Sequence, residues 1–389
     1  MNIIYVSNLI SESKMNRIIE TANKKPLQSI QKFHRLLCKG FIANHVKVKT
    51  ISAIPMSREI SNKIVWFDKR EEENEICYQY VPFLNYRGIR QICIALGTFF
   101  LIMKELIAGK KEKVFVCDIL DTTISYITLI LSKVFKFTCV GIVTDLPENM
   151  EKTTRLSKFL ENDCDLYIVL TEKMNERINK KCKPYIVMEG LVDKEMSLKC
   201  NTIEEKYSKK VCIYAGGLYE KYGVKTLIEA FEEVALENIE LHIYGTGDLV
   251  GYIEKIKSKK IKYYGVVENS KIVNEELKAT LLINPRYTTE EYTKYSFPSK
   301  NMEYMVSGTP ILTTKLPGMP KEYLPYVYLF DDETKDGYRN KLEEVLKKTE
   351  QELFLKGKHA RDFVLNNKNN VIQSKRTMDL INEYERNKK

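Results

Sequence analysis

Hydrophobic residues along the chain fall into two successive series of short β-branched runs, each followed by a stretch with helical spacing. Strands buried on both faces of a parallel sheet are apolar runs of this length, and the connecting helices cover both faces. The pattern therefore predicts an α/β protein with two parallel sheets. The ten predicted strands are residues 3–7, 46–53, 114–117, 139–144 and 166–170 in the first series, and 211–215, 241–244, 261–264, 281–284 and 311–314 in the second.

A polar segment, residues 191–209, separates the two series and has almost no periodic apolar signal. We therefore predict two Rossmann-like domains, the first over residues 1–195 and the second over residues 196–365. Residues 366–389 have helical spacing and mixed charge, and we predict a closing helix that packs back towards the first domain. Ligands of such sheets bind beyond the carboxyl ends of the strands, so we expect the functional site in loops facing a central cleft between the domains.

Composition supports a globular, intracellular protein. The chain has 389 residues, more than the ~250–300 over which one core usually extends. Its nine cysteines are odd in number and never spaced as CxxC, which favours reduced thiols over a disulfide framework or a zinc site. The N-terminus lacks the features of a signal peptide, so we expect a soluble, cytoplasmic protein.

Two apolar stretches, residues 92–103 and 124–131, are too short to span a membrane, which takes about 20 residues. We expect both to be buried helices. The alternative is a membrane-docking surface, which would place the protein peripherally at the inner face of the membrane. The net charge of +10 comes mostly from residues 1–200, which hold 31 basic and 23 acidic residues. That excess suits an anionic lipid, a diphosphate-bearing acceptor or simply a solvated basic face, and we expect no nucleic-acid partner.

The most informative segment is SFPSKNMEYMVSGTP, from Ser296 to Pro310, which follows the predicted strand 281–284. We predict a helix from about Phe297 to Ser307, with Ser296 as the N-cap and Gly308 ending it. The start of such a helix offers unpaired N–H groups and the positive end of the macrodipole, which together attract an anion.

Lys300 falls in the first turn of this predicted helix, where the dipole makes a cation unfavourable unless an anion binds nearby. Glu303 lies on the same face and next to Ser299, where its carboxylate could accept hydrogen bonds from the two hydroxyls of a ribose. A surface ion pair between Lys300 and Glu303 explains the spacing equally well.

This segment resembles glycosyltransferase family 4, in which two glutamates separated by seven residues cross the start of a helix in the C-terminal domain. Glu303 matches the second glutamate, which the resemblance implies binds the ribose of the donor. The first falls at Tyr295, so the donor sugar must be contacted differently, with Glu290 or Glu291 as candidates. The FPSKxxEYxxSGxP pattern is similar to that of a bacterial polysaccharide subgroup.

The resemblance extends along the second half. Residues 212–231 look like the family's first strand, glycine loop and helix, in which Gly216 and Gly217 let the backbone approach a diphosphate. The family usually has Arg at the position of Gly217 and Lys at that of Tyr222, so the phosphate-binding cations are rearranged. The candidates for that role are Lys221, Lys300 and Arg286. The segment 263–267 matches a position near the nucleotide base and makes Val267 a donor-binding candidate.

The first half resembles the family more weakly. Asp118 follows a predicted strand near the place where many relatives carry a histidine that touches the donor sugar, and Asp145 lies in GIVTDLP, a loop after a strand. We treat both as candidate catalytic residues together with Lys300, although a strand-end cap or turn role is equally consistent. The four histidines have no metal-ligand spacing, and the resemblance also implies an enzyme without metal or other cofactor.

The resemblance implies a GT-B fold and a retaining hexosyltransferase. The expected reaction moves a sugar from a nucleotide-sugar donor to a saccharide or lipid-linked acceptor in cell-surface polysaccharide synthesis, such as a capsule or exopolysaccharide. Two alternatives remain: a non-catalytic subunit of the same fold that acts through a protein partner, and a nucleotide-sugar epimerase.

Overall fold

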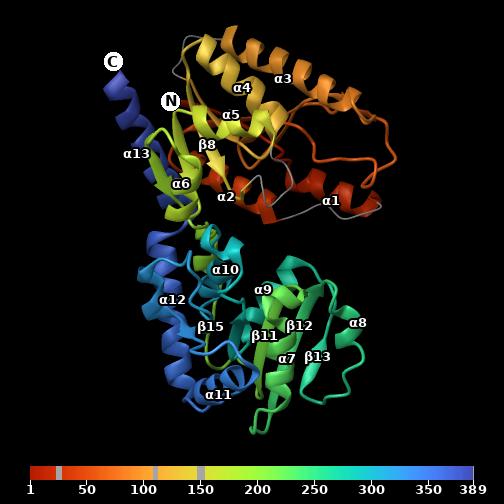
Figure 1. The fold of residues 1–389 in the computed structure, drawn as a ribbon, viewed down its shortest axis with the longest axis vertical. Coiled ribbons are helices and arrows are strands. Elements are labelled where there is room, and N and C mark those ends of the chain that lie inside the picture. Colours follow the sequence, from red (N-terminus) through yellow and green to blue (C-terminus); the bar gives the residue numbers. More distant parts are fainter. Residues whose placement is uncertain (23–28, 108–112, 147–153, 389) are drawn as a thin grey trace. The chain divides into compact units, whose positions relative to one another are not determined.

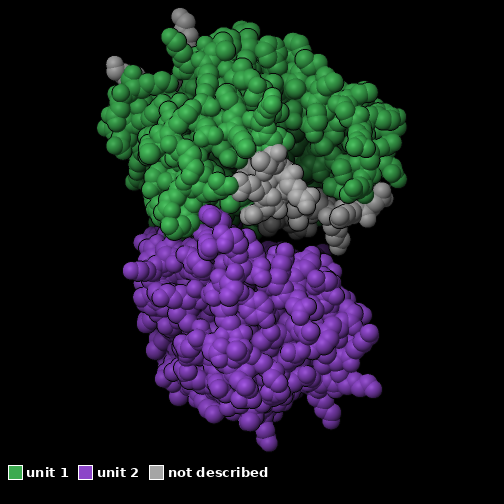
Figure 2. All heavy atoms as spheres, in the orientation of Figure 1, with its two compact units in different colours: residues 1–191, 370–389 green, residues 192–369 purple. Residues whose placement is uncertain are grey.

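The computed structural model describes residues 1–22, 29–107, 113–146 and 154–388, which form two compact units (Figures 1 and 2). The first unit comprises residues 1–191 and 370–389, and the second comprises residues 192–369. The chain therefore enters the second unit once and returns to the first for its last helix. Each unit has its own sheet and its own core.

The first unit contains an eight-stranded sheet in the order β10-β9-β8-β7-β1-β2-β5-β4 and a two-stranded ribbon of β3 and β6. All neighbouring strands of the large sheet are parallel except β4 and β5. The elements of this unit are β1 (Asn2–Ser7), α1 (Glu12–Thr21), α2 (Ser29–Ala43), β2 (Lys47–Ser52), β3 (Val65–Trp66), β4 (Glu71–Glu73), β5 (Ile76–Tyr80), β6 (Phe83–Leu84), α3 (Ile89–Ile107), β7 (Lys113–Asp118), α4 (Thr122–Val134), β8 (Thr138–Val143), α5 (Arg155–Asp163), β9 (Leu166–Val169), α6 (Glu172–Ile178), β10 (Tyr185–Val187) and α13 (Asn370–Lys388).

The second unit contains a six-stranded, all-parallel sheet in the order β13-β12-β11-β14-β15-β16. Short 3-10 helices at Lys194–Leu198, Glu220–Tyr222, Glu291–Lys294 and Lys321–Tyr326 join its parts. The other elements are β11 (Lys210–Gly217), α7 (Val224–Glu232), β12 (Ile239–Thr246), α8 (Val250–Ile253), β13 (Ile261–Tyr263), α9 (Asn269–Lys278), β14 (Leu281–Asn284), α10 (Ser299–Ser307), β15 (Ile311–Thr313), β16 (Tyr328–Leu329), α11 (Lys335–Leu346) and α12 (Glu350–Asn367).

Alternate residues of β11 show why helices cover both faces of the second sheet. Cys212 and Tyr214 pack into a core with α7 and α11, whereas Val211 and Ile213 pack into a second core with α10 and α12. Successive side chains of a strand point to opposite faces, so a strand that is apolar at every position needs cover on both sides. The α/β architecture predicted from the sequence is confirmed, and all ten predicted strands are present.

The helix α3 corrects one expectation. Residues 92–103 were expected to form a buried helix, but only one face of α3 is buried, through Ile94, Thr98, Ile102 and Glu105. Ile92, Leu96, Phe99 and Phe100 are exposed on the other face. Burial of α4 agrees with the expectation, because Ile124, Leu129 and Leu131 lie in the core. Within the described residues, no helix combines the length and the apolar character needed to cross a bilayer.

The last helix, α13, packs against α2 within the first unit. Ser374 Oγ donates a hydrogen bond to the carbonyl of Leu37 at 3.1 Å, and Asn44 Nδ2 donates to the carbonyl of Val371 at 2.8 Å. The helices meet at Gly40, where a Cβ atom would lie 2.1 Å from the carbonyl oxygen of Asn370. Only glycine allows this approach of the two backbones.

The close approach at Gly40 predicts the effect of a single methyl group. We expect Gly40→Ala to lower the free energy of unfolding of the first unit by about 2 kcal/mol or more, because a backbone carbonyl cannot move away as a side chain can. Urea unfolding followed by the fluorescence of Trp66, the single tryptophan of the chain, reports on that unit. The control is Gly251→Ala in α8, where a Cβ meets no atom within 4 Å. Equal unfolding midpoints for the two variants would contradict this packing.

Candidate functional site

The helix α10 begins at Ser299, two residues later than the sequence predicts. Pro298 is the N-cap and supplies no side-chain hydrogen bond to the helix. The prediction of Ser296 as the N-cap was wrong, because its hydroxyl donates to the carbonyl of Tyr292 at 3.2 Å instead. Gly308 ends the helix with φ 80°, as predicted. The start of α10 therefore carries N–H groups that no capping side chain satisfies.

Tyr304 fixes α10 to the end of strand β11. Its hydroxyl accepts a hydrogen bond from the backbone N–H of Ala215 at 2.9 Å and lies 3.4 Å from the carbonyl oxygen of the same residue. Tyr304 is completely buried, and it follows Glu303 in the motif. It was not among the predicted site residues, although its place in the FPSKxxEY pattern was the available signal. Through this bond the first turn of α10 is held over the loop after β11.

Lys300 lies in that first turn, directly against Gly216. A Cβ atom at Gly216 would come within 1.2 Å of Lys300 Nζ, and Nζ lies 4.9 Å from the centre of the Tyr214 ring. Burial, and then the nearby positive charge of Arg286, lower the pKa of Lys300 to about 7. Glu303 and Glu276 act in the opposite direction, but more weakly. Lys300 and Gly216, both predicted donor-binding residues, thus lie in contact.

Arg286 follows β14 and packs on aromatic rings. Its guanidinium carbon lies 4.5 Å from the centre of the Tyr222 ring and 6.0 Å from that of Tyr292. A Cβ at Gly217 would meet the rings of Tyr219 and Tyr222 at 2.8 and 3.1 Å. Tyrosine rings therefore fill the space that an Arg side chain at position 217 would need. Arg286 packs on one of these rings, that of Tyr222. This explains physically how the cation can come from another loop.

Two positive groups consequently lie close together at the start of α10. Among the ion pairs of the described residues, none involves Lys300 or Arg286. Like charges raise each other's energy in a partly desolvated site, and burial penalises an uncompensated cation further. A bound anion with two or more charges would remove both penalties. The arrangement is suited to a diphosphate.

The remaining donor-binding candidates lie around this centre or at its edge. Glu303 is partly buried one turn after Lys300, and Ser299 is exposed. Lys221 is exposed, with its ammonium 5.7 Å from the centre of the Tyr222 ring. Val267 is partly buried against the core of the second unit. Of these residues, Glu303 is the one whose charge the structure couples to Lys300.

Tyr295 and its neighbours lie at a 3-10 helix. Tyr295 is the C-cap of the 3-10 helix Glu291–Lys294, and Glu290 is its N-cap. Glu291 is exposed and forms an ion pair with Lys294 at 2.7 Å. These positions do not test a contact with the donor sugar, so Glu290 and Glu291 stay predictions for that contact.

The two aspartates belong to the first unit. Asp118 is completely buried; it lies 3.0 Å from His34 Nε2, and its other oxygen accepts the N–H of Leu120 at 3.0 Å. Tyr5 completes the chain with its hydroxyl 2.6 Å from His34 Nδ1. These bonds favour the strand-end cap role for Asp118. Asp145 is partly buried and accepts the N–H of Leu146 at 2.7 Å, while Pro147 of the GIVTDLP segment lies outside the described residues.

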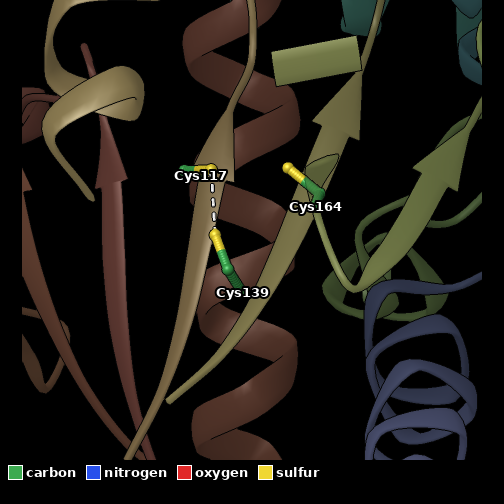
Figure 3. Close-up of side chains that lie close together, drawn as sticks. All are labelled: Cys117, Cys139 and Cys164. Carbon is green, nitrogen blue, oxygen red and sulfur yellow. Dashed lines mark hydrogen bonds between the residues drawn. The ribbon is translucent and has the colours of Figure 1, made fainter. Parts of the chain in front are cut away.

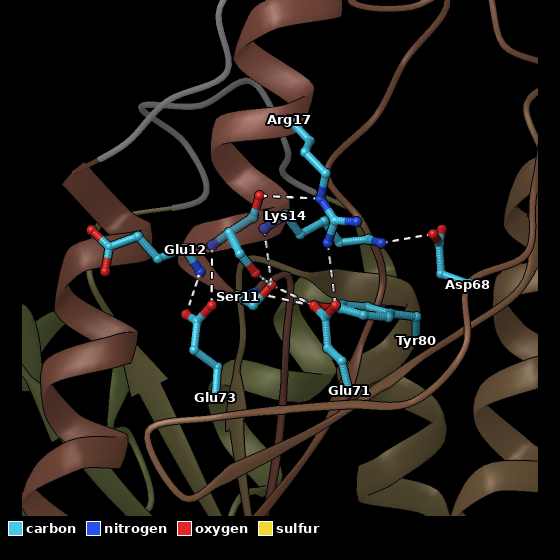
Figure 4. A network of polar contacts seen from close by, with 9 residues as sticks. Ser11, Glu12, Lys14, Arg17, Asp68, Glu71, Glu73 and Tyr80 are labelled. Atoms are coloured by element: carbon cyan, nitrogen blue, oxygen red, sulfur yellow. Dashed lines mark hydrogen bonds and ion pairs between the residues drawn. The ribbon is translucent and has the colours of Figure 1, made fainter.

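The start of α1 contrasts with that of α10, because side chains of the same unit already occupy it (Figure 4). Glu73 accepts hydrogen bonds from the backbone N–H groups of Glu12 at 2.7 Å and Ser13 at 3.1 Å. Although burial opposes its ionisation, these bonds lower the pKa of Glu73. Ser11 caps the same turn by accepting the N–H of Lys14 at 3.1 Å. This helix start is thus satisfied by the protein itself.

Three cysteines form a cluster that sequence reasoning missed (Figure 3). The sulfur atoms of Cys117, Cys139 and Cys164 all lie within 4.8 Å of one another, and all three residues are buried. Gly141, two residues after Cys139 on β8, makes the room, because a Cβ there would lie 2.9 Å from Cys164 Sγ. Their spacing in sequence gave no signal, since parallel pairing of β7 and β8 brings them together. Three thiolates could hold a thiophilic metal, whereas structural zinc takes four ligands. The expectation of no metal stays a prediction.

Comparison with known proteins agrees with this geometry. Residues 201–369 match the family model of the glycosyl transferases group 1. That range covers most of the second unit, which contains α10 and β11. No curated protein sequence matches the chain.

Solved structures resemble the whole chain. Sucrose-phosphate synthase from Thermosynechococcus elongatus has a TM-score of 0.72 at 12% identity, with 98% of this chain and 99% of that chain covered. The catalytic domain of starch synthase IV from Arabidopsis thaliana, bound to ADP and acarbose, has 0.67 at 10% identity and 99% of each chain covered. The HepE protein of Anabaena in complex with UDP has 0.64 at 12% identity, with 98% of this chain and 100% of that chain covered.

The solved structures share the GT-B fold with this chain, and residues 201–369 are similar to the glycosyl transferases group 1. The predicted GT-B fold is confirmed. The narrower resemblance to family 4 and its polysaccharide subgroup stays a prediction.

The lowered pKa of Lys300 predicts an affinity for nucleoside diphosphates that depends on pH. A bound diphosphate favours the protonated lysine and raises its pKa above 7, so binding takes up a proton near pH 8. We expect the affinity to fall as the pH rises from 7 towards 9, by up to about tenfold per pH unit. Calorimetric titration in two buffers of different ionisation enthalpy measures the uptake. The control is Lys300→Arg, whose charge does not titrate, so that the slope should disappear.

The contact between Gly216 and Lys300 predicts a second effect. The added methyl group of Gly216→Ala would displace the ammonium, which is the far end of a flexible side chain and can move. We expect the affinity for the same nucleotide to fall about tenfold or more, as for the loss of one charged hydrogen bond, while the melting temperature changes little. Gly251→Ala again serves as the control. If Gly216→Ala binds the nucleotide as tightly as the wild type, Lys300 does not contact the nucleotide.

Proposed function

We propose that the protein is a retaining glycosyltransferase that binds a nucleotide-sugar donor at the start of α10 and transfers the sugar to a saccharide or lipid-linked saccharide acceptor. The transferred sugar would become part of a cell-surface polysaccharide, such as a capsule or exopolysaccharide. The protein would be cytoplasmic, with a peripheral contact at the inner face of the membrane.

The observation that carries this proposal is the pair of cations at the start of α10. Lys300 and Arg286 lie close enough for the charge of Arg286 to lower the pKa of Lys300. Helix N–H groups and two nearby cations suit a diphosphate that gains negative charge as it leaves the sugar. Groups of this kind typically contribute about 3 kcal/mol each to the transition state. They would also perform the task that a metal ion performs in other transferases, and no cofactor is part of the proposal.

Glu303 is the proposed ribose ligand. Its carboxylate lies one turn from Lys300 on the same helix, where it can accept hydrogen bonds from two neighbouring hydroxyls. Two of the structural relatives support the nucleotide part of the proposal, since HepE is in complex with UDP and starch synthase IV is bound to ADP. Because the base differs between them, the donor of this chain is left open to UDP, GDP, ADP and dTDP sugars.

The proposal predicts the effect of removing the carboxylate of Glu303. In a thermal-shift panel of UDP, GDP, ADP and dTDP with their sugars, we expect one base to stabilise the wild-type protein. Glu303→Ala should weaken that nucleotide about tenfold to a hundredfold, because two hydrogen bonds to a charged group are lost. It should also abolish hydrolysis of the nucleotide sugar. The control is Glu344→Ala, an exposed residue of α11 paired only at the surface with Lys341.

The two alternative functions give different results. A non-catalytic subunit acting through a protein partner is favoured by Tyr295 in the place of the family's first glutamate, and it would bind nucleotide without turnover under any acceptor condition. An epimerase would release an epimerised sugar without an acceptor. Hydrolysis or transfer that depends on Glu303 would exclude the first, and an unchanged sugar in the product would exclude the second.

A further inference from the structure

Large apolar side chains gather on one face of the first unit, around α3 and the ribbon of β3 and β6. Figure 1 shows α3 at the edge of its unit beside α4. The two ribbon strands pair Val65 with Leu84 and Trp66 with Phe83. We name this face the α3 surface, and its exposed apolar residues are Val65, Phe67, Leu84, Tyr86, Ile89, Ile92, Leu96, Phe99, Phe100 and Ile107.

The spacing along α3 separates two apolar faces. Residues 89, 92, 96, 99, 100 and 107 fall on one side of a helix with 3.6 residues per turn. Ile94, Thr98 and Ile102 fall on the opposite side and are buried in the unit. The outer stripe is well exposed, with Ile92 at 61% and Phe100 at 66%, and Phe67 on the ribbon is at 74%. Contiguous exposed apolar surface of this kind marks an interaction site.

The charges around the α3 surface are positive. Between residues 84 and 107 the single acidic residue is Glu105, which is buried and paired with Lys49 at 2.9 Å. Three cations lie over aromatic rings of the same region: Arg58 over Tyr86 at 5.4 Å, Lys63 over Trp66 at 4.6 Å and Arg90 over Phe83 at 5.3 Å. Arg87 and Lys104 are exposed at either end. The acids nearest to β3 in the sequence are Glu59 and Asp68; Asp68 is paired with Lys14, and Glu59 is exposed.

We propose that the α3 surface docks the protein on an anionic membrane. An interfacial helix has an apolar face with Phe and Leu, cations at its edges, and aromatic rings at the level of the headgroups. Each lysine or arginine near an anionic leaflet adds to the attraction. A second copy of the chain would bring the same cations against these, which opposes self-association. The lipid of a lipid-linked acceptor would lie at the same surface, and in that respect alone the inference rests on the proposed function.

Vesicle flotation with the full chain tests the docking surface. We expect the wild-type protein to float with vesicles made of equal parts phosphatidylcholine and phosphatidylglycerol, and to bind vesicles of phosphatidylcholine alone much more weakly. Phe100→Glu should reduce binding about tenfold or more, because one large apolar side chain is no longer buried. Lys104→Glu should reduce binding to the anionic vesicles several-fold, and added salt should do the same.

A matched control is Leu198→Glu, which places the same charge at the most exposed apolar side chain of the second unit, at 82%. We expect it to float like the wild type. Equal flotation of wild type and Phe100→Glu, or no flotation with anionic vesicles, would overturn the proposal. Self-association in ultracentrifugation that Phe100→Glu abolishes would reassign the face to a protein partner and overturn it too. Nucleotide-sugar hydrolysis without vesicles should be equal in Phe100→Glu and wild type. This assay tests the donor site independently of membrane docking, so failure of one proposal can be told from failure of the other.

Discussion

Two positive charges held close together at the start of α10 are the feature around which the second unit is organised. Burial, and then the nearby charge of Arg286, make the charged form of Lys300 costly in free energy, as its lowered pKa indicates. Such a cost persists where a ligand compensates it, which is why perturbed pKa values concentrate at functional sites. The surrounding residues can be understood by how they hold these two cations in place.

Two contacts fix the position of Lys300. Tyr304 ties α10 to Ala215, and the absence of a side chain at Gly216 gives the ammonium its space. Arg286 is held differently, by packing its flat guanidinium on Tyr222 and Tyr292. Aromatic rings orient a guanidinium without neutralising its charge. The tyrosines therefore replace the positional role that an arginine after the glycine loop would have, and they keep the positive charge available.

The sequence predicts ten of the strands in the described residues and misses β3, β4, β5, β6, β10 and β16, although β5 is buried. The ten strands were found because a strand buried on both faces is apolar throughout, and that signal is local. The ribbon of β3 and β6 has two residues in each strand, too few for a period to be seen. The outward face of α3 was expected to be buried because its residues are apolar. Exposure, however, depends on what packs against the helix, which hydropathy does not show.

The site shows the same division. Gly216, Lys300 and Glu303 could be predicted as candidates because glycine loops and helix starts have local patterns. Ser296 was wrong as an N-cap because Tyr292 offers its hydroxyl a carbonyl partner. Tyr304, Tyr222 and the cluster of Cys117, Cys139 and Cys164 depend on which strands lie side by side, and a single sequence contains no direct record of that.

The starts of α1 and α10 differ in how their backbone N–H groups are satisfied, and that difference bears on where an anion can bind. At α1 the carboxylate of Glu73 accepts two backbone N–H groups, so a phosphate would have to displace a negative charge already in place. At α10 the N-cap is Pro298, which offers no side-chain acceptor, and the first turn carries Lys300 instead of an acid. Both starts follow a strand of a parallel sheet, and both have the dipole that attracts anions. Side chains make the difference: Glu73 neutralises the start of α1, whereas the start of α10 has no side-chain cap and can accept an anion.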